Sequence, residues 1–82
     1  MKVYCYNNKR NICGNNVKRL RKKLKISQAE LAARLQVSGV SIERDSISRI
    51  ESGLRFVSDF ELKVLAKVLN TDVNELVDSE KD

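Results

Sequence analysis

The 82-residue chain contains no proline, no tryptophan and no histidine, and it has only three glycines, two tyrosines and two phenylalanines. Without proline and with little glycine, it lacks the turn residues that join the many short strands of a β-sandwich or barrel. Apolar residues still make up 41% of the chain. A chain of this length has room for one modest core. We therefore expect one all-α domain.

The absence of histidine removes the usual general base and a common zinc ligand. The two cysteines, Cys5 and Cys13, are expected to be free thiols in a reducing compartment. The chain also lacks a glycine-rich phosphate loop, and it is too short to surround a catalytic pocket with supporting side chains. We expect a binding module with no enzymatic activity, no metal and no cofactor.

Long hydrophobic runs are missing as well. No stretch approaches the roughly 18 consecutive apolar residues of a membrane span. Residues 1–10 lack the apolar segment of a secretory signal peptide. We expect a cytoplasmic protein with no membrane partner.

Charge is distributed unevenly along the chain, whose formal net charge is +5. Residues 1–29 contain nine Lys or Arg and no Asp or Glu, whereas residues 72–82 contain five carboxylates and one lysine. A basic segment can bind a phosphate backbone by releasing its counterions. The same charges are equally well explained as the solvated side of a helix.

The first helix is predicted from just after Asn11 to about Leu24, preceded by an arm or short strand over residues 1–10. Four apolar residues follow the i, i+4, i+7, i+11 spacing of one helix face: Cys13, Val17, Leu20 and Leu24. This spacing places Cys13 in the core. It also directs the charged residues of the helix elsewhere, namely Lys18, Arg19, Arg21, Lys22 and Lys23.

Two further helices follow closely. Ser27 and Glu30 have the spacing of a capping box, which predicts a helix over about residues 28–38 that ends at Gly39. After a connector at 40–43, a third helix is expected over about residues 44–52. Its inner side carries Ile47 and Ile50, and Gly53 ends it.

A second capping box at residues 58–61 predicts a fourth helix over about residues 59–69. This helix has two apolar faces. One is formed by Leu62, Leu65, Ala66 and Leu69, and the nearly opposite one by Phe60, Val64 and Val68. Asp72 and Glu75 open a short fifth helix, and an acidic tail covers residues 79–82.

Three sequence pieces occur together in a recognisable order: Ser-Gln-x-Glu-Leu-Ala at residues 27–32, Ile-Ser-Arg-Ile-Glu-x-Gly at 47–53 and Leu-Ala-Lys-x-Leu at 65–69. With these pieces the chain resembles the Cro and phage-repressor-like (XRE) helix-turn-helix family over about residues 17–77. The resemblance implies a five-helix lambda-repressor-like DNA-binding domain at residues 11–78, with a short N-terminal arm.

The resemblance also implies which residues contact double-stranded DNA. The base-facing set is Gln28, Arg44, Asp45, Ser46, Ser48 and Arg49, and the phosphate-contacting set is Ser27, Ser52 and Arg55. Asp45 is alternatively explained as a helix-dipole partner or as a residue that holds an arginine. The alternatives for the phosphate set are a helix cap for Ser27, a helix-end residue for Ser52 and a solvated loop charge for Arg55.

The sequence departs from the common family pattern in two places. Nine residues separate Val37 from Ile47, about twice the usual turn, and Glu43 stands where a Ser or Thr cap is usual. The longer spacing weakens any transfer of base contacts by exact position. Near DNA, the Glu43 carboxylate would repel phosphate unless it bonds a base amine or a neighbouring arginine.

The implied function is sequence-specific DNA binding by a transcriptional regulator, expected to be a repressor that binds as a homodimer. The candidate dimer interface comprises Phe60, Val64, Val68, Val73, Leu76 and Val77. Packing of these residues within one chain is the alternative. A second hypothesis is an antitoxin-type module that binds a toxin partner and its own promoter.

Overall fold

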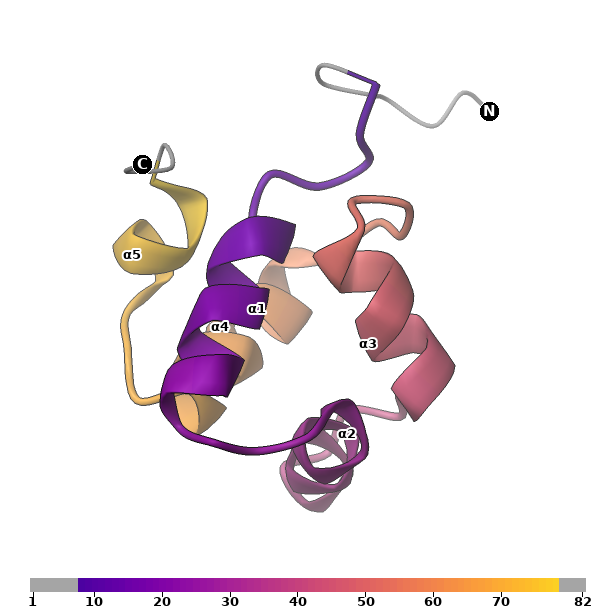
Figure 1. Ribbon diagram of the computed structural model, residues 1–82, viewed down its shortest axis with the longest axis vertical. Coiled ribbons are helices and arrows are strands. Elements are labelled where there is room, and N and C mark those ends of the chain that lie inside the picture. Colours follow the sequence, from indigo (N-terminus) through magenta and orange to yellow (C-terminus); the bar gives the residue numbers. More distant parts are fainter. Residues whose placement is uncertain (1–7, 79–82) are drawn as a thin grey trace.

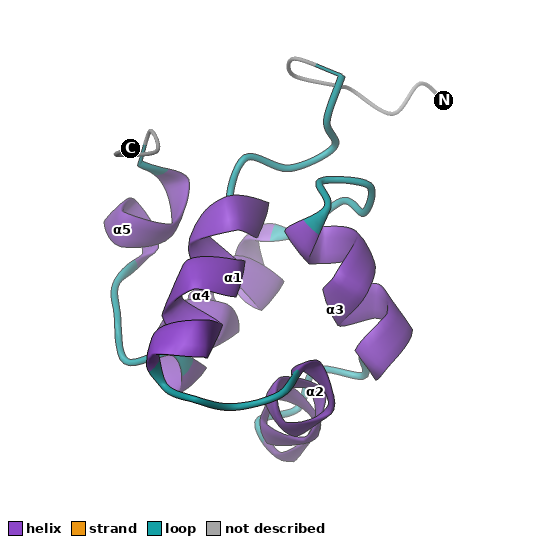
Figure 2. Cartoon of the chain, viewed as in Figure 1, coloured by secondary structure: helices purple, strands orange, loops and turns teal. Residues whose placement is uncertain are grey.

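The computed structural model describes residues 8–78, which form five helices and no β-strand in that range (Figure 2). The helices are α1 (Gly14–Lys23), α2 (Gln28–Val37), α3 (Arg44–Glu51), α4 (Asp59–Val68) and α5 (Val73–Val77). The prediction of an all-α chain with five helices is confirmed. Most of the predicted arm (residues 1–7) and the whole acidic tail (79–82) lie outside the described residues.

The helices pack around one core within a body of 31 × 30 × 19 Å. α3 packs against α1 and α2, α2 also contacts α4, and α5 packs against α1 and α4. Figure 1 shows α3 and α5 on opposite sides of the molecule, with α1 between them. One flank of α3 is therefore left uncovered by the other described helices.

The helix starts follow from short-range hydrogen bonds that the sequence predicts. The Ser27 hydroxyl accepts from the Glu30 amide at 3.0 Å, and the Glu30 carboxylate accepts from the Ser27 amide at 2.8 Å. Ser58 and Glu61 form the same capping box at the start of α4. These bonds satisfy amides that have no partner inside the helix.

At the start of α5, Asp72 and Glu75 have the spacing of a capping box, but only one of the two hydrogen bonds of that motif forms. Asp72 accepts from the Glu75 amide at 2.8 Å, which caps the helix. The Glu75 carboxylate instead forms an ion pair with Arg19 of α1, also at 2.8 Å. The side chain of Glu75 thus ties α5 to α1.

Helices α1 to α4 all end in a Schellman motif, in which a residue with positive φ reverses the chain. Gly39 (φ 96°) and Gly53 (φ 79°) fill this position after α2 and α3, as predicted, and Lys25 (φ 61°) and Asn70 (φ 58°) fill it after α1 and α4. Each of these four helices ends one residue before its predicted end, because that last residue is the C-cap.

The core draws on every helix and on the connectors. Its fully buried side chains are Cys13, Val17, Leu31, Leu35, Ile47, Ile50, Leu65, Leu69 and Leu76. Burial raises the pKa of the Cys13 thiol to about 11, so this cysteine is an inert core residue. The predicted apolar face of the first helix is confirmed, with Leu24 half-buried at its end.

The long connector after α2 is part of the core. Val40 and Ile42 are 3% and 4% exposed, and the Gln36 side-chain amide donates to the Ile42 carbonyl at 2.6 Å. Because two apolar residues anchor it, the extra length does not free α3 from α2. Within the described chain, Glu43 makes no capping hydrogen bond with its side chain at the start of α3.

Two predictions about exposed faces are wrong. Arg21 was expected to point away from the core, but it is only 9% exposed. Leu76 was a candidate interface residue, but its side chain is fully buried. The short α5 turns this leucine inward, between α1 and α4, so it is not available to a partner.

None of the helices within residues 8–78 combines the length and the apolarity that crossing a membrane requires.

Candidate nucleic-acid interface

The outward side of α3 is the centre of the candidate site. Ile47 and Ile50 have no exposed surface and fix the helix to the core. On the other side, Arg44, Asp45 and Arg49 are exposed, and Ser46 and Ser48 are half-buried. Arg44, Asp45, Ser48 and Arg49 fall within roughly 140° of the helix circumference at 100° per residue. The five α3 residues predicted to face bases therefore lie on or beside one accessible surface.

Two arginines on this surface differ in their surroundings. The Arg44 guanidinium lies 3.0 Å from the Asp45 carboxylate, and both side chains are well exposed. An exposed pair of this kind contributes little stability, so it opens readily when a stronger partner arrives. The structure thus favours the alternative in which Asp45 holds an arginine.

Arg49 is the second of these arginines. Among residues 8–78, its exposed guanidinium has no hydrogen-bond or ion-pair partner. A guanidinium presents a planar fork of donors that matches the two acceptors of guanine. Arg49 is the residue of α3 whose full donor set is accessible.

Gln28, the first residue of α2, lies beside the end of α3. Its side-chain amide donates to the Glu51 carboxylate at 3.1 Å. Glu51 in turn pairs with Arg21, whose Nε and Nη2 atoms lie 2.6 and 3.1 Å from its two oxygens. Arg21 also donates to the Ile26 carbonyl at 3.0 Å. The hydrogen bond with Glu51 raises the pKa of Arg21, against the opposing effect of burial.

This network was not predicted from the sequence, although the sequence contains a signal for it. Arg21 stands four residues after Val17, and Glu51 stands four residues after Ile47. Residues four apart share one helix face. Charges of opposite sign on the inner faces of two helices indicated a buried pair, since an unpaired charge there would be costly.

The residues predicted to contact phosphate already have partners within the chain. Ser27 forms the cap of α2, and the Ser52 hydroxyl donates to the Ser48 carbonyl at 2.9 Å. Both are exposed, so phosphate contact at these residues stays a prediction.

Arg55 is not a solvated loop charge, because it is half-buried and forms two hydrogen bonds with Glu61, at 3.1 and 3.2 Å. Burial raises the pKa of the Glu61 carboxyl, but the hydrogen bonds from Arg55 and from the Ser58 amide outweigh this effect and leave the pKa below its ordinary value. Arg55 thus links the loop after α3 to the start of α4.

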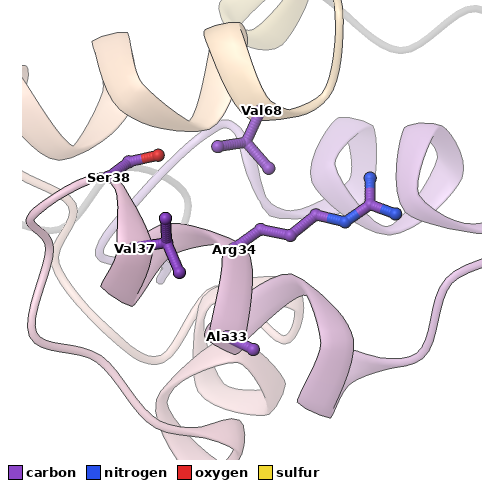
Figure 3. A pocket seen from close by; sticks show the side chains of 5 residues that line it. All are labelled: Ala33, Arg34, Val37, Ser38 and Val68. Atoms are coloured by element: carbon purple, nitrogen blue, oxygen red, sulfur yellow. The ribbon is translucent and has the colours of Figure 1, made fainter.

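The residues of the candidate dimer surface differ in how exposed their side chains are. Phe60 is 59% exposed, whereas Val64, Val68 and Val73 are half-buried against the core, and Val77 is half-buried too. Val68 faces α2 (Figure 3). Together with Ala33, Arg34, Val37 and Ser38 it lines an open hollow of about 380 Å³. The hollow contains none of the residues predicted to contact DNA.

Comparison with known proteins agrees with this geometry. Residues 17–76 match the helix-turn-helix family, so the chain belongs to that family. It is a family of DNA-binding domains and not of enzymes. No curated protein sequence matches this chain significantly.

Among solved structures, the chain is similar to the P22 c2 repressor, crystallised with a synthetic operator in the presence of thallium ions. The TM-score is 0.70 and the sequence identity 27%, with 85% of this chain and 98% of that chain covered. The predicted lambda-repressor-like fold is thereby confirmed. Residues 17–76, which match the helix-turn-helix family, contain all of α2 and α3.

Proposed function

We propose that this chain is a sequence-specific transcriptional regulator that binds double-stranded DNA with α3 in the major groove and acts as a repressor. The observation that carries the proposal is the two-sided character of α3, with two isoleucines completely buried and Arg49 exposed on the opposite side. An α-helix fits the major groove of B-DNA, where every base pair presents its own pattern of donors and acceptors. We place such a regulator in the cytoplasm, the compartment expected from the sequence.

The similar P22 c2 repressor supports the choice of ligand, because it was crystallised with an operator. The base-facing set remains the one predicted for α3 together with Gln28. Arg49 is assigned to guanine, and Arg44 becomes available to DNA when its surface pair with Asp45 opens.

The test begins with selection of bound duplexes from random DNA, followed by affinity measurements on the consensus and on a scrambled duplex. Arg49→Ala should reduce the discrimination between these two duplexes by about 1–3 kcal/mol. Lys67→Ala is the control. It removes an exposed cation from the C-terminal end of α4, outside the predicted base-facing set, and should leave the discrimination unchanged. Equal weakening of both duplexes by Arg49→Ala would reject base recognition by this residue.

The proposed regulator binds as a two-fold homodimer. Half-sites in successive major grooves lie about 34 Å apart. Two copies of a body 31 × 30 × 19 Å across can meet side by side at this spacing. The contact proposed is the exposed apolar surface around Phe60, now extended by Leu54 and Phe56, which are 62% and 60% exposed. Val64 and Val68 are half-buried, so only the exposed part of each side chain contributes to this contact.

Phe60→Asp tests this interface better than a change at half-buried Val64, because its effect on the core of one chain is small. We expect the mass measured by sedimentation to fall toward that of a monomer, with weaker binding to a palindromic duplex. Ser41→Asp is the control, since Ser41 is exposed in the connector between α2 and α3 and does not line the hollow beside Val68. An unchanged mass and affinity for Phe60→Asp would remove the interface, and a co-purifying second protein would favour the antitoxin hypothesis.

A further inference from the structure

A buried polar network joins the three helices that form the proposed DNA-binding unit. Arg21 comes from α1, Gln28 is the first residue of α2 and Glu51 is the last residue of α3. Arg21 and Glu51 are 9% and 7% exposed, and their side chains meet through two hydrogen bonds. Gln28 completes the network at its outer edge through the 3.1 Å bond from its Nε2 to Glu51.

The chemistry of Glu51 fixes the orientation of the Gln28 amide. A carboxylate accepts hydrogen bonds and cannot donate them, so only the amide nitrogen of Gln28 can face it. This leaves the Gln28 oxygen and one N–H for another partner. Within residues 8–78, no buried side-chain oxygen or nitrogen lacks a hydrogen-bond partner. The Gln28 oxygen has none there, so it is exposed to solvent.

These two free groups match one kind of DNA edge. Phosphate oxygens only accept hydrogen bonds, so they offer nothing to the Gln28 oxygen. Adenine presents the N6 amine as a donor and N7 as an acceptor in the major groove, and glutamine pairs with both at once. Arg21 neutralises Glu51, which allows a carboxylate to stand close to the DNA surface without repelling it.

We propose that Glu51 is a positioning residue that holds the Gln28 amide in the orientation required to read an adenine in the major groove. The proposal rests on the proposed function, because it assumes that α2 and α3 face DNA. It adds a specificity-determining role for Gln28 and assigns the buried pair to that role in addition to stability.

The first experiment uses the wild-type protein and the consensus duplex selected from random DNA. The contacted position is defined as the adenine whose preference is lost in Gln28→Ala. At that position, 7-deazaadenine removes the N7 acceptor, and purine removes the N6 amine. Each replacement should weaken binding by wild type several-fold, up to about tenfold, and should have no effect on Gln28→Ala.

The second experiment removes the positioning group. Arg21→Met/Glu51→Leu replaces the two charges together, so that neither is left buried without its partner. We expect this variant to remain folded and to lose most of the preference for adenine at the same position. In the Gln28→Ala background the double replacement should change that preference no further. Circular dichroism at the binding temperature confirms the folded fraction of each variant.

The outcomes distinguish a failure of the proposed DNA-binding function from a failure of the proposed role of Gln28 and Glu51. If wild type selects no consensus at all, the proposed function itself fails. If a consensus exists but Gln28→Ala weakens every sequence equally, Gln28 contacts phosphate and the present inference is rejected. A preference that survives in Arg21→Met/Glu51→Leu would also overturn it, since Gln28 would then need no positioning.

Discussion

Close approach between α1 and α3 depends on the residues at the start of α1. The Asn11 side chain donates to the carbonyls of Ile50 and Arg55, at 3.1 and 2.7 Å, and accepts from the Gly14 amide at 2.8 Å. A Cβ atom added at Gly14 would lie only 2.2 Å from the Ile50 carbonyl oxygen. Gly14 thus permits a contact between helices, and Asn11 fastens it.

Gly14→Ala should destabilise the protein by about 1–3 kcal/mol, because the new methyl group forces α3 away from α1. The free energy of unfolding in urea measures the effect. Asn15→Ala is the control, since Asn15 is the next residue of α1 and is exposed. It should change stability by no more than about 0.5 kcal/mol. Equal stability of wild type and Gly14→Ala would contradict the close contact.

The C-terminal ends of helices α1 to α4 depend on a left-handed backbone conformation that only some residues adopt easily. Lys25 has a φ of 61°, in the left-handed region, at the position that glycine occupies after α2 and α3. A side chain there costs free energy that glycine avoids, although glycine also gains more freedom in the unfolded chain. The sequence has glycine at two of the four Schellman motifs.

Lys25→Gly is therefore expected to stabilise the protein by about 0.5–1 kcal/mol. The same replacement at Lys18, an exposed position in the middle of α1, should destabilise it by roughly the same amount. Thermal and urea unfolding of both variants check the opposite signs. Destabilisation by Lys25→Gly would show that the side chain of Lys25 has a stabilising role of its own.

The link between the α3–α4 loop and α4 should depend on pH. Hydrogen bonds from Arg55 and Ser58 lower the pKa of Glu61 in the folded state despite its burial. The stabilisation is therefore fully present above the unfolded pKa of glutamate, about 4.3, and is lost as the pH falls through the lower folded value.

Glu61→Gln removes this titration while keeping the shape of the side chain. Wild type should be more stable than this variant at neutral pH, and the difference should shrink as the pH falls below about 4. Urea unfolding at a series of pH values measures it. A difference that stays constant from neutral to acidic pH would reject the role of the Arg55–Glu61 pair.

At the scale of the whole molecule, the number of exposed cations determines how many phosphates the protein can contact. Basic residues prevail in the first part of the chain and acidic ones at its end. In the fold, Arg21 is withdrawn into the core, whereas Lys18, Lys22 and Lys25 remain exposed. The number of cations available for phosphate is therefore smaller than the sequence count.

Binding to DNA should weaken steeply with salt, because each phosphate contact releases counterions, with a slope of roughly −0.9 per contact in a plot of log K against log salt. Measuring the affinity for one consensus duplex at several potassium chloride concentrations gives the slope. Unfolding curves at the same concentrations serve as the control for stability. A flat profile would argue against phosphate contact altogether.

Local sequence signals determined much of this structure. Capping boxes at Ser27 and Ser58 and the glycines after α2 and α3 allowed the ends of α2, α3 and α4 to be predicted to within one residue, whereas α1 begins later than predicted, at Gly14. These signals act over three or four residues, so the sequence displays them directly. The buried face of α3 was predictable for the same reason, since Ile47 and Ile50 share one side of a short helix.

Contacts between distant residues were decided only by the tertiary structure. Arg21 meets Glu51 across 30 positions, and Asn16 donates to the carbonyl of Leu76 across 60. Such pairs depend on which helix faces come together, a choice that the spacing of apolar residues leaves open. The same choice buried Leu76, exposed Phe56 and Phe60, and placed Gln28 at the edge of a network that gives its amide one orientation.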